Sequence, residues 1–366
     1  MARATASEPD PDRLKLYSFA VFTKLEGALT AGMIHLGDRL GLYTAMRDAG
    51  EPLTSVQLAE RTGLAERWLR EWAHNQAAAK LLSWAEGADG VERFSMTPEA
   101  VAVLSDPDHP AFGMGMFHRL PQTMQTLEPI AESFRTGIGL DYDAFGPEGA
   151  AGIERSFGPW YRNFLVPVAL PALDGVVPRL EEGAKAIDIG CGAGIAVLTM
   201  AAQYPESTFD GYDISEHALA RAESSRAEKG IANAGFHNAR RELIPFDRSV
   251  DFVTTFDCIH DMTDPVGMME TIRSAIKDDG VWLLVDIKGR DSFAENIEKN
   301  PMAPMMYGVS VMSCMSSALS EPGGAGLGTL GLPESLARTM TADAGFTRFR
   351  RLPIDHPVNA FYEVRP

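Results

Sequence analysis

The stretch "AIDIGCGAGIAV", Ala186 to Val197, places three glycines at alternate positions just past the middle of the chain. The apolar run before Gly190 is typical of a short strand, and "IAVLTMAAQYP" after Gly194 has the spacing of a helix. We therefore predict a turn between a strand and a helix. Glycine in such a turn lets the backbone approach a ligand closely, beside the free N–H groups that begin the helix.

The spacing of these glycines separates classes of ligand. A pyrophosphate-binding turn follows G-x-G-x-x-G, whereas Gly190, Gly192 and Gly194 follow G-x-G-x-G. Asp188 ends the strand and adds a carboxylate that suits a cationic amino-acid end. The stretch "STFDGYDIS" predicts a second strand ending in Asp213, which can accept both hydroxyls of a ribose. Together these features indicate S-adenosylmethionine, and the alternative is an ordinary tight turn.

Composition excludes several other kinds of partner. The chain has 366 residues, 45% of them hydrophobic, which is enough for two domains. A net charge of −17 opposes nucleic acid as a partner. The three cysteines, Cys191, Cys258 and Cys314, lack the spacing of metal sites or disulfide frameworks. With neither a signal peptide nor an apolar run of ~18 residues, we expect a cytoplasmic protein without a bound metal and without membrane contact.

The first part of the chain has the pattern of a winged helix. Apolar residues recur at helical spacing from Leu14, Thr54 or Ser55 can cap a short helix that Gly63 ends, and a longer helix is predicted over residues 65–82. The stretch "EGADG" then predicts the tip of a hairpin. We expect three tryptophans to pack the core of this domain, Trp68, Trp72 and Trp84.

The rest of the chain changes character twice. Residues from 110 to 179 are rich in aromatic residues, Met and Pro, which favours kinked helices that cover something. From Ala184 onward strand-like and helix-like runs alternate, which is typical of a doubly wound parallel sheet. The predicted organisation is a disordered tail over 1–11, a winged-helix dimerisation domain over 12–105, a helical linker and substrate-covering segment over 106–180, and a Rossmann-like catalytic domain over 181–366.

Four motifs follow one another between residues 180 and 290: "AIDIGCGAG", "FDGYDIS", "LIPFDRSVDFVTTFDCIHDMTDP" and "DDGVWLLVDI". In this order and spacing they resemble the class I S-adenosylmethionine-dependent methyltransferases. The N-terminal part resembles the winged-helix domain that packs a dimer in small-molecule O-methyltransferases. The resemblance implies an α/β fold, in which a doubly wound, Rossmann-like methyltransferase sheet follows a mainly helical winged-helix domain. "FTRFRRLPI" and "VNAFYEVR" would form its antiparallel end.

The resemblance also implies which residues hold the cofactor. The expected contacts to S-adenosylmethionine come from Asp188, Gly190, Gly192, Gly194, Asp213, Ile214, Arg240, Asp257 and Cys258. Arg240 stands where the family usually places an acidic residue for the adenine amino group. Either Glu242 takes that role, or backbone and apolar contacts near Leu243 hold the adenine.

The stretch "FDCIHDMTDP" follows the fourth predicted strand and lies at the edge of the predicted sheet where the ligand binds. Methyl transfer is an in-line displacement, and a base is needed only when the acceptor must lose a proton. We predict His260 and Asp261 as catalytic residues, with His260 at the start of a helix as the base and Asp261 or Asp264 orienting its ring. The alternative is that His260 is structural.

The acceptor pocket is expected between segments outside the minimal sheet. "NPMAPMMYGVSVMSCMSSALS" is rich in methionine, which adapts to irregular apolar ligands. The opposite wall would come from the aromatic residues of the covering segment. The predicted pocket residues are Tyr142, Phe157, Trp160, Tyr161, Met306 and Met312. The alternative is that these side chains belong to the core.

The sequence thus predicts a homodimeric methyltransferase for a small, largely apolar molecule, with oxygen favoured over nitrogen or carbon as the acceptor atom. One alternative keeps the sulfonium ligand but uses it for another reaction, such as cyclisation. A second alternative is a regulator that senses S-adenosylmethionine and binds DNA through its winged helix. Arg67, Arg70 and Lys80 on that helix face Glu66 and Glu71, a smaller basic excess than a DNA reader carries.

Overall fold

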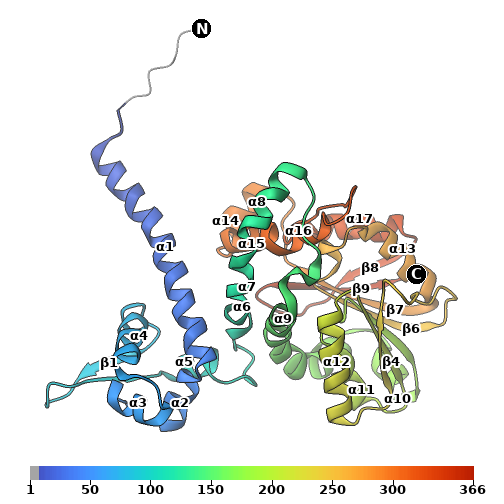
Figure 1. Ribbon diagram of the computed structural model, residues 1–366. Helices are drawn as coiled ribbons and strands as arrows, with labels where there is room; N and C mark the ends of the chain where they lie inside the picture. The colour runs from blue at the N-terminus through green and yellow to red at the C-terminus, as the bar shows by residue number, and fades with distance from the viewer. Residues whose placement is uncertain (1–7) are drawn as a thin grey trace, which may run out of the picture. The chain divides into compact units, whose positions relative to one another are not determined.

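The computed structural model describes residues 8–366. The chain divides into two compact units, and the boundary lies between Leu120 and Pro121 (Figure 1). The first unit ends at Leu120, whereas the predicted domain ended at residue 105. The difference arises because a short helix over Met114–His118 packs against the first helix of the chain. Residues 1–7 of the predicted tail lie outside the described residues. Asp10 caps the first helix and Pro11 begins it, so the tail does not extend to residue 11.

The first unit has the element order of a winged helix. Its helices are α1 (Pro11–Arg39), α2 (Leu42–Ala49), α3 (Ser55–Thr62), α4 (Glu66–Ala78), α5 (Pro98–Leu104) and α6 (Met114–His118). Thr54 caps α3 and Gly63 ends it in the left-handed conformation, as predicted. The predicted hairpin is confirmed as β1 (Ser83–Glu86) paired antiparallel with β2 (Glu92–Ser95). Helix α4 ends earlier than predicted, since Lys80 has a φ of 63° that a helix cannot contain.

The tryptophan prediction for this unit is only partly confirmed. Trp72 is buried, packs against Tyr43 and donates a hydrogen bond to the carbonyl of Met33 at 3.0 Å. Trp68 and Trp84 are 81% and 58% exposed. Both lie on faces that the small core of the unit does not cover, because residues such as Leu42, Leu58 and Leu69 already fill it.

The second unit begins with a helical segment and continues into the sheet. The helical elements before the sheet are α7 (Leu120–Gln125), α8 (Leu127–Thr136), the 3-10 helix η1 (Tyr142–Phe145), α9 (Gly146–Trp160), the π-helix η2 (Tyr161–Ala169), the 3-10 helix η3 (Leu170–Ala172) and α10 (Val176–Glu182). Pro159 lies inside α9 and Pro167 inside η2, so proline does interrupt this run as its composition suggested.

A seven-stranded sheet organises the second unit, in the order β5-β4-β3-β6-β7-β9-β8. Its strands are β3 (Lys185–Ile189), β4 (Thr208–Asp213), β5 (Ala234–Asn238), β6 (Val250–Phe256), β7 (Ile276–Ile287), β8 (Arg348–Arg351) and β9 (Asn359–Arg365). Strands β3 to β7 are mutually parallel, and β9 pairs antiparallel with both β7 and β8. The strand order reverses between β3 and β6, and their carboxyl ends mark the place where doubly wound sheets bind ligands.

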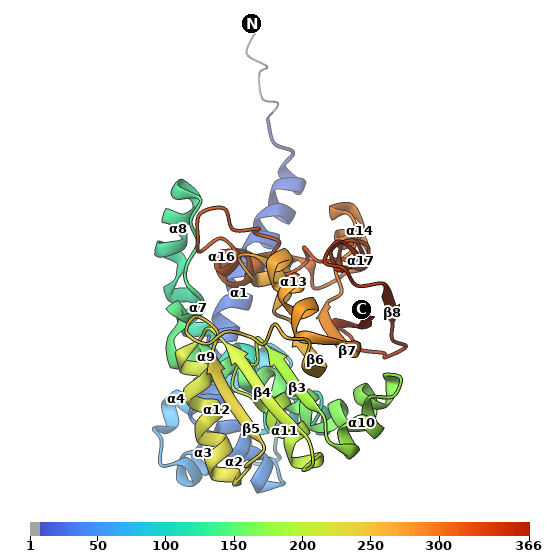
Figure 2. The same cartoon turned by 90° about the vertical axis from the view of Figure 1, so that its right-hand side faces the viewer.

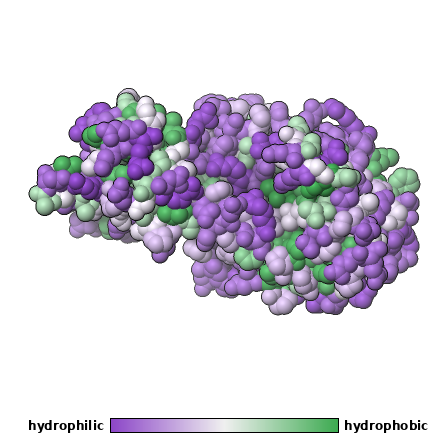
Figure 3. Space-filling view, turned by 90° about the horizontal axis from the view of Figure 1, so that it is seen from below, coloured by the Kyte–Doolittle hydropathy of each residue, from purple (hydrophilic) through white to green (hydrophobic). Residues whose placement is uncertain are grey.

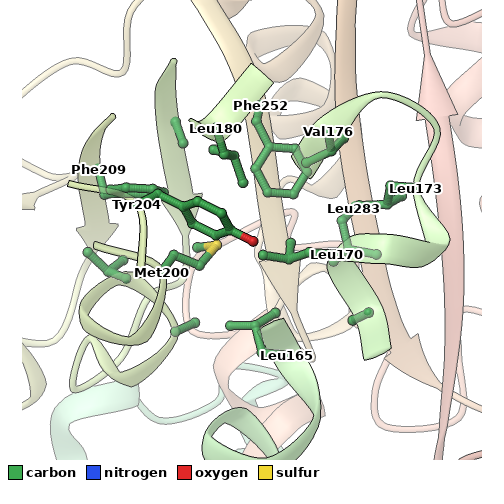
Figure 4. Close-up of a cluster of buried hydrophobic side chains, with 14 of the residues drawn as sticks. Leu165, Leu170, Leu173, Val176, Leu180, Met200, Tyr204, Phe209, Phe252 and Leu283 are labelled. Atoms are coloured by element: carbon green, nitrogen blue, oxygen red, sulfur yellow. The ribbon is translucent and has the colours of Figure 1, made fainter. Parts of the chain in front are cut away.

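Helices cover both faces of this sheet (Figure 2). The remaining helical elements are α11 (Ile195–Gln203), α12 (Glu216–Lys229), the 3-10 turn η4 (Ile259–Asp261), α13 (Pro265–Ala275), α14 (Phe293–Lys299), α15 (Ala303–Val309), the π-helix η5 (Ser310–Cys314), α16 (Met315–Ala318) and α17 (Glu334–Asp343). On one face Leu165, Leu170 and Leu180 pack with Phe209 and Phe252 from the strands (Figure 4). On the other face α13 and α17 pack against the sheet, with Trp282 fully buried.

The surface is mostly hydrophilic on the face shown in Figure 3, with smaller apolar areas between the hydrophilic residues. Within residues 8–366 no single helix is both long and apolar enough to cross a membrane. One pair, Tyr142–Ala172 with Val176–Glu182, reaches that length and composition only when taken together, and it is bent by 107°.

Candidate active site

The glycine turn between β3 and α11 adopts a conformation that other residues rarely adopt. Gly190, Gly192 and Gly194 have φ values of 71°, 53° and 72°. A Cβ on Gly190 would meet Cys258 at 2.6 Å, and one on Gly194 would meet the ring of Phe236 at 2.4 Å. A Cβ on Gly192 would meet nothing within 4 Å. Two of the glycines therefore allow close internal packing, and Gly192 is the one that borders open space.

Two carboxylates from the strand ends lie beside this turn. Asp213 accepts a hydrogen bond from the backbone N–H of Gly192 at 2.7 Å and another from Ser215 at 2.7 Å. Asp188 accepts one from the hydroxyl of Thr254 at 2.6 Å. Burial and the charge of Asp213 raise the pKa of Asp188 to about 7, and burial raises the pKa of Asp213. Burial therefore makes the ionised form of both carboxylates unfavourable. A cation bound beside them would stabilise that form.

A third, half-buried carboxylate follows the end of β6. Asp257 has a φ of 51°, which is uncommon for an aspartate, and Asn359 at the start of β9 donates a hydrogen bond to its side chain. Burial and the charge of Asp286 raise the pKa of Asp257 to about 7. The neighbouring thiol of Cys258 donates to the carbonyl of Ile189 at 3.2 Å, so Cys258 ties this loop to β3.

His260 lies in the turn η4 and is 2% exposed. Its Nδ1 donates to Asp286 at 2.6 Å, and Asp286 ends the apolar run of β7 with an exposure of 2%. Burial opposes protonation of His260, but the charge and hydrogen bond of Asp286 outweigh it and raise the pKa of the imidazole well above its usual value. The pair is therefore a histidine whose tautomer and ring orientation are fixed by a buried carboxylate.

Three details of the His260 prediction were wrong. The residue lies in a 3-10 turn, and α13 begins later, at Pro265. Asp264 caps α13 through the N–H of Gly267 and does not reach the ring. Asp261 lies near His260, but the hydrogen bond that orients the ring comes from Asp286. Burial raises the pKa of Asp261 to about 7.

The methionine-rich segment lies over this loop. Met306 on α15 is buried, and its sulfur accepts a hydrogen bond from Asn300 at 3.1 Å. Met312 lies half-buried in η5, the π-helical turn that also carries Cys314. The glycine-rich loop over residues 321–331 is held across the site by the N–H of Gly328, which donates to the carbonyl of His260 at 3.1 Å. Of the methionine-rich segment, Cys314 lies next to His260, and the assignment of Met306 and Met312 to an acceptor pocket stays a prediction.

The predicted aromatic wall divides into two parts. Trp160 stacks on Phe361 at 5.2 Å and packs into the core beneath the sheet edge. Tyr161 lies edge-on to Phe256 at 5.0 Å. Burial and the charges of Asp188 and Asp257 raise the pKa of Tyr161 well above its usual value. Phe157 packs on Tyr161 at 6.2 Å, and Tyr142 begins η1.

The predicted adenine side is more exposed. Ile214 is half-buried after Asp213, and Arg240 forms an ion pair with Asp141. Glu242 accepts a hydrogen bond from His237 at 2.8 Å, so it is already engaged. Leu243 is 82% exposed.

Sequence reasoning missed two residues of this site, Asp286 and Asn359. A usable signal existed for the first of them. Asp188, Asp213 and Asp257 were selected because each lies at or just after the end of an apolar strand, and Asp286 ends "VWLLVD" in the same way. No local pattern marks Asn359, which meets Asp257 across 102 positions of the chain.

The described residues fit a cationic ligand at this edge. Asp188 and Asp213 are buried at the ends of β3 and β4, Asp257 is half-buried just after β6, and Asp213 holds Gly192, which borders open space. S-adenosylmethionine carries an ammonium and a sulfonium, so its positive charges match these carboxylates. Its ribose hydroxyls can donate to the lone pairs of Asp213 that do not accept hydrogen bonds from the backbone.

Comparison with known proteins agrees with this geometry. Residues 180–327 match the family described as "Methyltransferase domain", and residues 28–105 match the "Rv2258c-like winged HTH domain". The two ranges together cover more than half of the chain. None of the curated proteins compared with the sequence matches it.

Several solved structures share the fold along nearly the whole chain. A mitomycin 7-O-methyltransferase is 19% identical, with 97% of this chain and 99% of that chain covered and a TM-score of 0.68. Human N-acetylserotonin methyltransferase in complex with S-adenosylmethionine is 15% identical, with 99% of both chains covered and a TM-score of 0.66. A putative O-methyltransferase from Nostoc punctiforme is 15% identical, with 98% and 100% covered and a TM-score of 0.72.

The motifs, the sheet order and both family matches agree. The chain is a class I S-adenosylmethionine-dependent methyltransferase with an N-terminal winged-helix domain.

Proposed function

We propose that this enzyme transfers the methyl group to a hydroxyl oxygen of a small, largely apolar molecule, with His260 as the base. The observation that carries this proposal is the buried pair of His260 and Asp286, 2.6 Å apart, next to the methionine-rich wall. S-adenosylmethionine supplies an electrophilic methyl group on a sulfonium. The protein orients the two reactants, excludes water from the site and provides a base that accepts the proton.

The proton of the acceptor hydroxyl has one well-defined destination. Asp286 engages Nδ1 of His260, and the side chain of Cys314 also hydrogen-bonds the ring. Because the pKa of the imidazole is raised, Nε2 must first lose its own proton; it can then accept the proton of the hydroxyl as the oxygen attacks. The imidazolium that forms is stabilised by the buried carboxylate of Asp286, because an opposite charge in hydrogen-bond contact favours the charged form. A neutral nitrogen or thioether acceptor would not need this arrangement.

The character of the pocket walls supports an apolar acceptor. In this proposal the methionine-rich elements α15 and η5 and the aromatic side chains of the covering segment line the acceptor pocket; Met306 is buried and Tyr161 packs on Phe256. Both η2 and η5 are π-helical, a distortion that occurs frequently at functional sites. Similar solved structures are described as O-methyltransferases, which also supports oxygen as the acceptor atom.

The experiment that tests this function is a metabolite screen with labelled S-adenosylmethionine. Purified enzyme should transfer one labelled methyl group to a small apolar hydroxyl compound in an extract, which mass spectrometry identifies directly. A labelled product methylated on nitrogen or carbon would contradict the choice of oxygen. Consumption of the cofactor with no methylated product would favour the alternative in which the sulfonium drives another reaction.

We also propose that the enzyme is a homodimer formed through α1. This helix exposes a row of large apolar side chains that its own unit leaves uncovered: Leu14, Leu16, Tyr17, Phe19, Val21, Phe22, Leu25 and Leu29. Exposed apolar area of this extent marks an interaction surface. Light scattering should give twice the chain mass. The double variant Phe19→Asp with Phe22→Asp should give a monomer, and Lys24→Glu on the same helix should remain dimeric. A monomeric native chain would contradict this assembly.

A further inference from the structure

Three side chains with different donor atoms converge beside the proposed base. His260 and Asp261 lie in η4, and Cys314 lies at the end of η5. One ligand atom from each lies within 4.8 Å of the others. Imidazole nitrogen, carboxylate oxygen and thiolate sulfur are the ligands that Zn²⁺ takes in proteins. No metal site was predicted from the sequence, because the cysteines are not paired there. These three side chains come together only in the folded chain.

The orientation of His260 supports a metal ligand. Its Nδ1 is engaged by Asp286, so Nε2 is the ring nitrogen left for a metal, and the hydrogen bond between the ring and the side chain of Cys314 already brings these two candidate ligands together. A histidine whose second nitrogen donates to a carboxylate is the usual arrangement behind a zinc ligand, because the carboxylate fixes the ring and raises its basicity. Asp286 is buried as well, which keeps this support in place.

The spacing of the three side chains also fits. Bonds of ~2.0–2.3 Å in tetrahedral geometry place ligand atoms roughly 3.3–3.8 Å apart. The observed limit of 4.8 Å needs only small side-chain adjustments to reach that separation. Three protein ligands leave a fourth position open, as in zinc sites that accept an exogenous ligand.

We propose that His260 Nε2, the carboxylate of Asp261 and the thiolate of Cys314 bind one Zn²⁺ ion, and that the bound ion stops methyl transfer. On binding, Cys314 loses its S–H proton, the imidazolium of His260 loses its Nε2 proton, and Asp261 loses its proton where it carries one. Bonds from Zn²⁺ to sulfur, nitrogen and oxygen form, and the protons leave to solvent. The ion then holds the lone pair that His260 needs as a base. This consequence for catalysis rests on the proposed function, whereas the metal site itself does not.

Cobalt titration of the full-length enzyme tests the site without any acceptor. Chelator-treated protein should bind one Co²⁺ per chain and develop an absorption band from charge transfer between thiolate and Co²⁺, which Zn²⁺ should remove. Cys314→Ser should abolish the band, and Cys191→Ser, which removes a buried thiol elsewhere, should keep it. A native enzyme without the band, or a band that survives in Cys314→Ser, would overturn the proposal.

Two further variants test the support of the histidine. Asp286→Asn should weaken Co²⁺ binding by about 10- to 100-fold, the usual range for losing such a carboxylate. Asp264→Asn, which alters only the cap of α13, should leave binding unchanged. Equal affinity in Asp286→Asn and the native enzyme would contradict the arrangement, provided that circular dichroism shows both folded.

The effect on catalysis is tested in the labelled-methyl screen. Zn²⁺ at the concentration that saturates the Co²⁺ site should stop methyl transfer, and a chelator should restore it. If the metal binds but transfer continues, the inhibitory part fails and His260 is not the base. If no metal binds, the metal site fails while the proposed function stands.

Discussion

The two halves of the site differ in how they are assembled. The cofactor half is built from residues close together in sequence, where Gly192 is held by Asp213 across 21 positions and the strand ends β3 and β4 are neighbours. The proposed acceptor half depends on contacts between segments far apart in the chain, such as the N–H of Gly328 with the carbonyl of His260. Local spacing therefore specifies the cofactor, and tertiary packing specifies the acceptor chemistry.

The largest expected effect is on turnover in the acceptor half. His260→Gln should lower the rate of methyl transfer by roughly 100- to 10,000-fold, because the acceptor proton loses its base. The measurement is the initial rate with the acceptor that the metabolite screen identifies. His109→Gln, an exposed histidine of the first unit, should keep the native rate. Near-native turnover in His260→Gln would show that positioning and desolvation alone carry the reaction.

A smaller effect is expected on binding in the cofactor half. Asp213→Ala should weaken S-adenosylmethionine by roughly 10- to 100-fold, since hydrogen bonds from the ribose to a carboxylate are worth about 1.5–3 kcal/mol. The variant also releases the N–H of Gly192, so the turn loses its support. Calorimetry measures the affinity. Asp343→Ala, an exposed aspartate at the end of α17, provides the control.

The pH dependence of cofactor binding sharpens the same comparison. Asp188 has a pKa of about 7, raised by burial and by Asp213, and it faces Thr254 on β6 and Tyr161 on η2. A bound cation favours the ionised carboxylate, so affinity is full above pH 7 and falls as the pH drops below it. The expected loss approaches tenfold per pH unit, because one proton must leave for each cation bound.

The variant Asp188→Asn provides the control for this pH effect. It should bind more weakly above pH 7 and lose most of the dependence, because its amide does not titrate. A native affinity that stays constant between pH 5 and 8 would contradict the assignment of Asp188 to the cation site.

The smallest effects concern stability, in a matched pair of glycines. Gly190→Ala places a Cβ 2.6 Å from Cys258 at a φ of 71°, and it should lower the free energy of unfolding by about 2–4 kcal/mol. Gly192→Ala has a positive φ but no clash, so about 1 kcal/mol is expected. Denaturant unfolding measures both. Equal losses would mean that the close packing at Cys258 does not matter.

Much of the fold could be predicted from the sequence because its signals are local. The glycine turn, the cap at Thr54, the hairpin tip and the antiparallel end of the sheet each follow from a few adjacent residues. The exposure of Trp68 could not be predicted, since helical spacing does not say how large a core the neighbouring elements will enclose. The early end of α4 depended on the conformation of Lys80, which no motif marks.

The residues of the candidate site could also be predicted where their signals are local, but not where they depend on packing between distant segments. Asp188, Asp213 and His260 were predicted as site residues because strand ends and their following turns meet at one edge of a parallel sheet, and their roles stay predictions. The partner of His260 was misassigned to Asp261 or Asp264, since proximity in sequence is a poor guide to which carboxylate shares a buried space. The neighbouring strand provided Asp286 instead.

One paired measurement tests most directly the division between a cofactor half and an acceptor half. S-adenosylmethionine is titrated calorimetrically into His260→Gln and Asp213→Ala in the same buffer, above pH 7. We expect the affinity of His260→Gln to remain within about twofold of native, and that of Asp213→Ala to fall by roughly 10- to 100-fold. If His260→Gln loses affinity as strongly as Asp213→Ala, His260 belongs to the cofactor pocket, and the account of His260 as the base is contradicted.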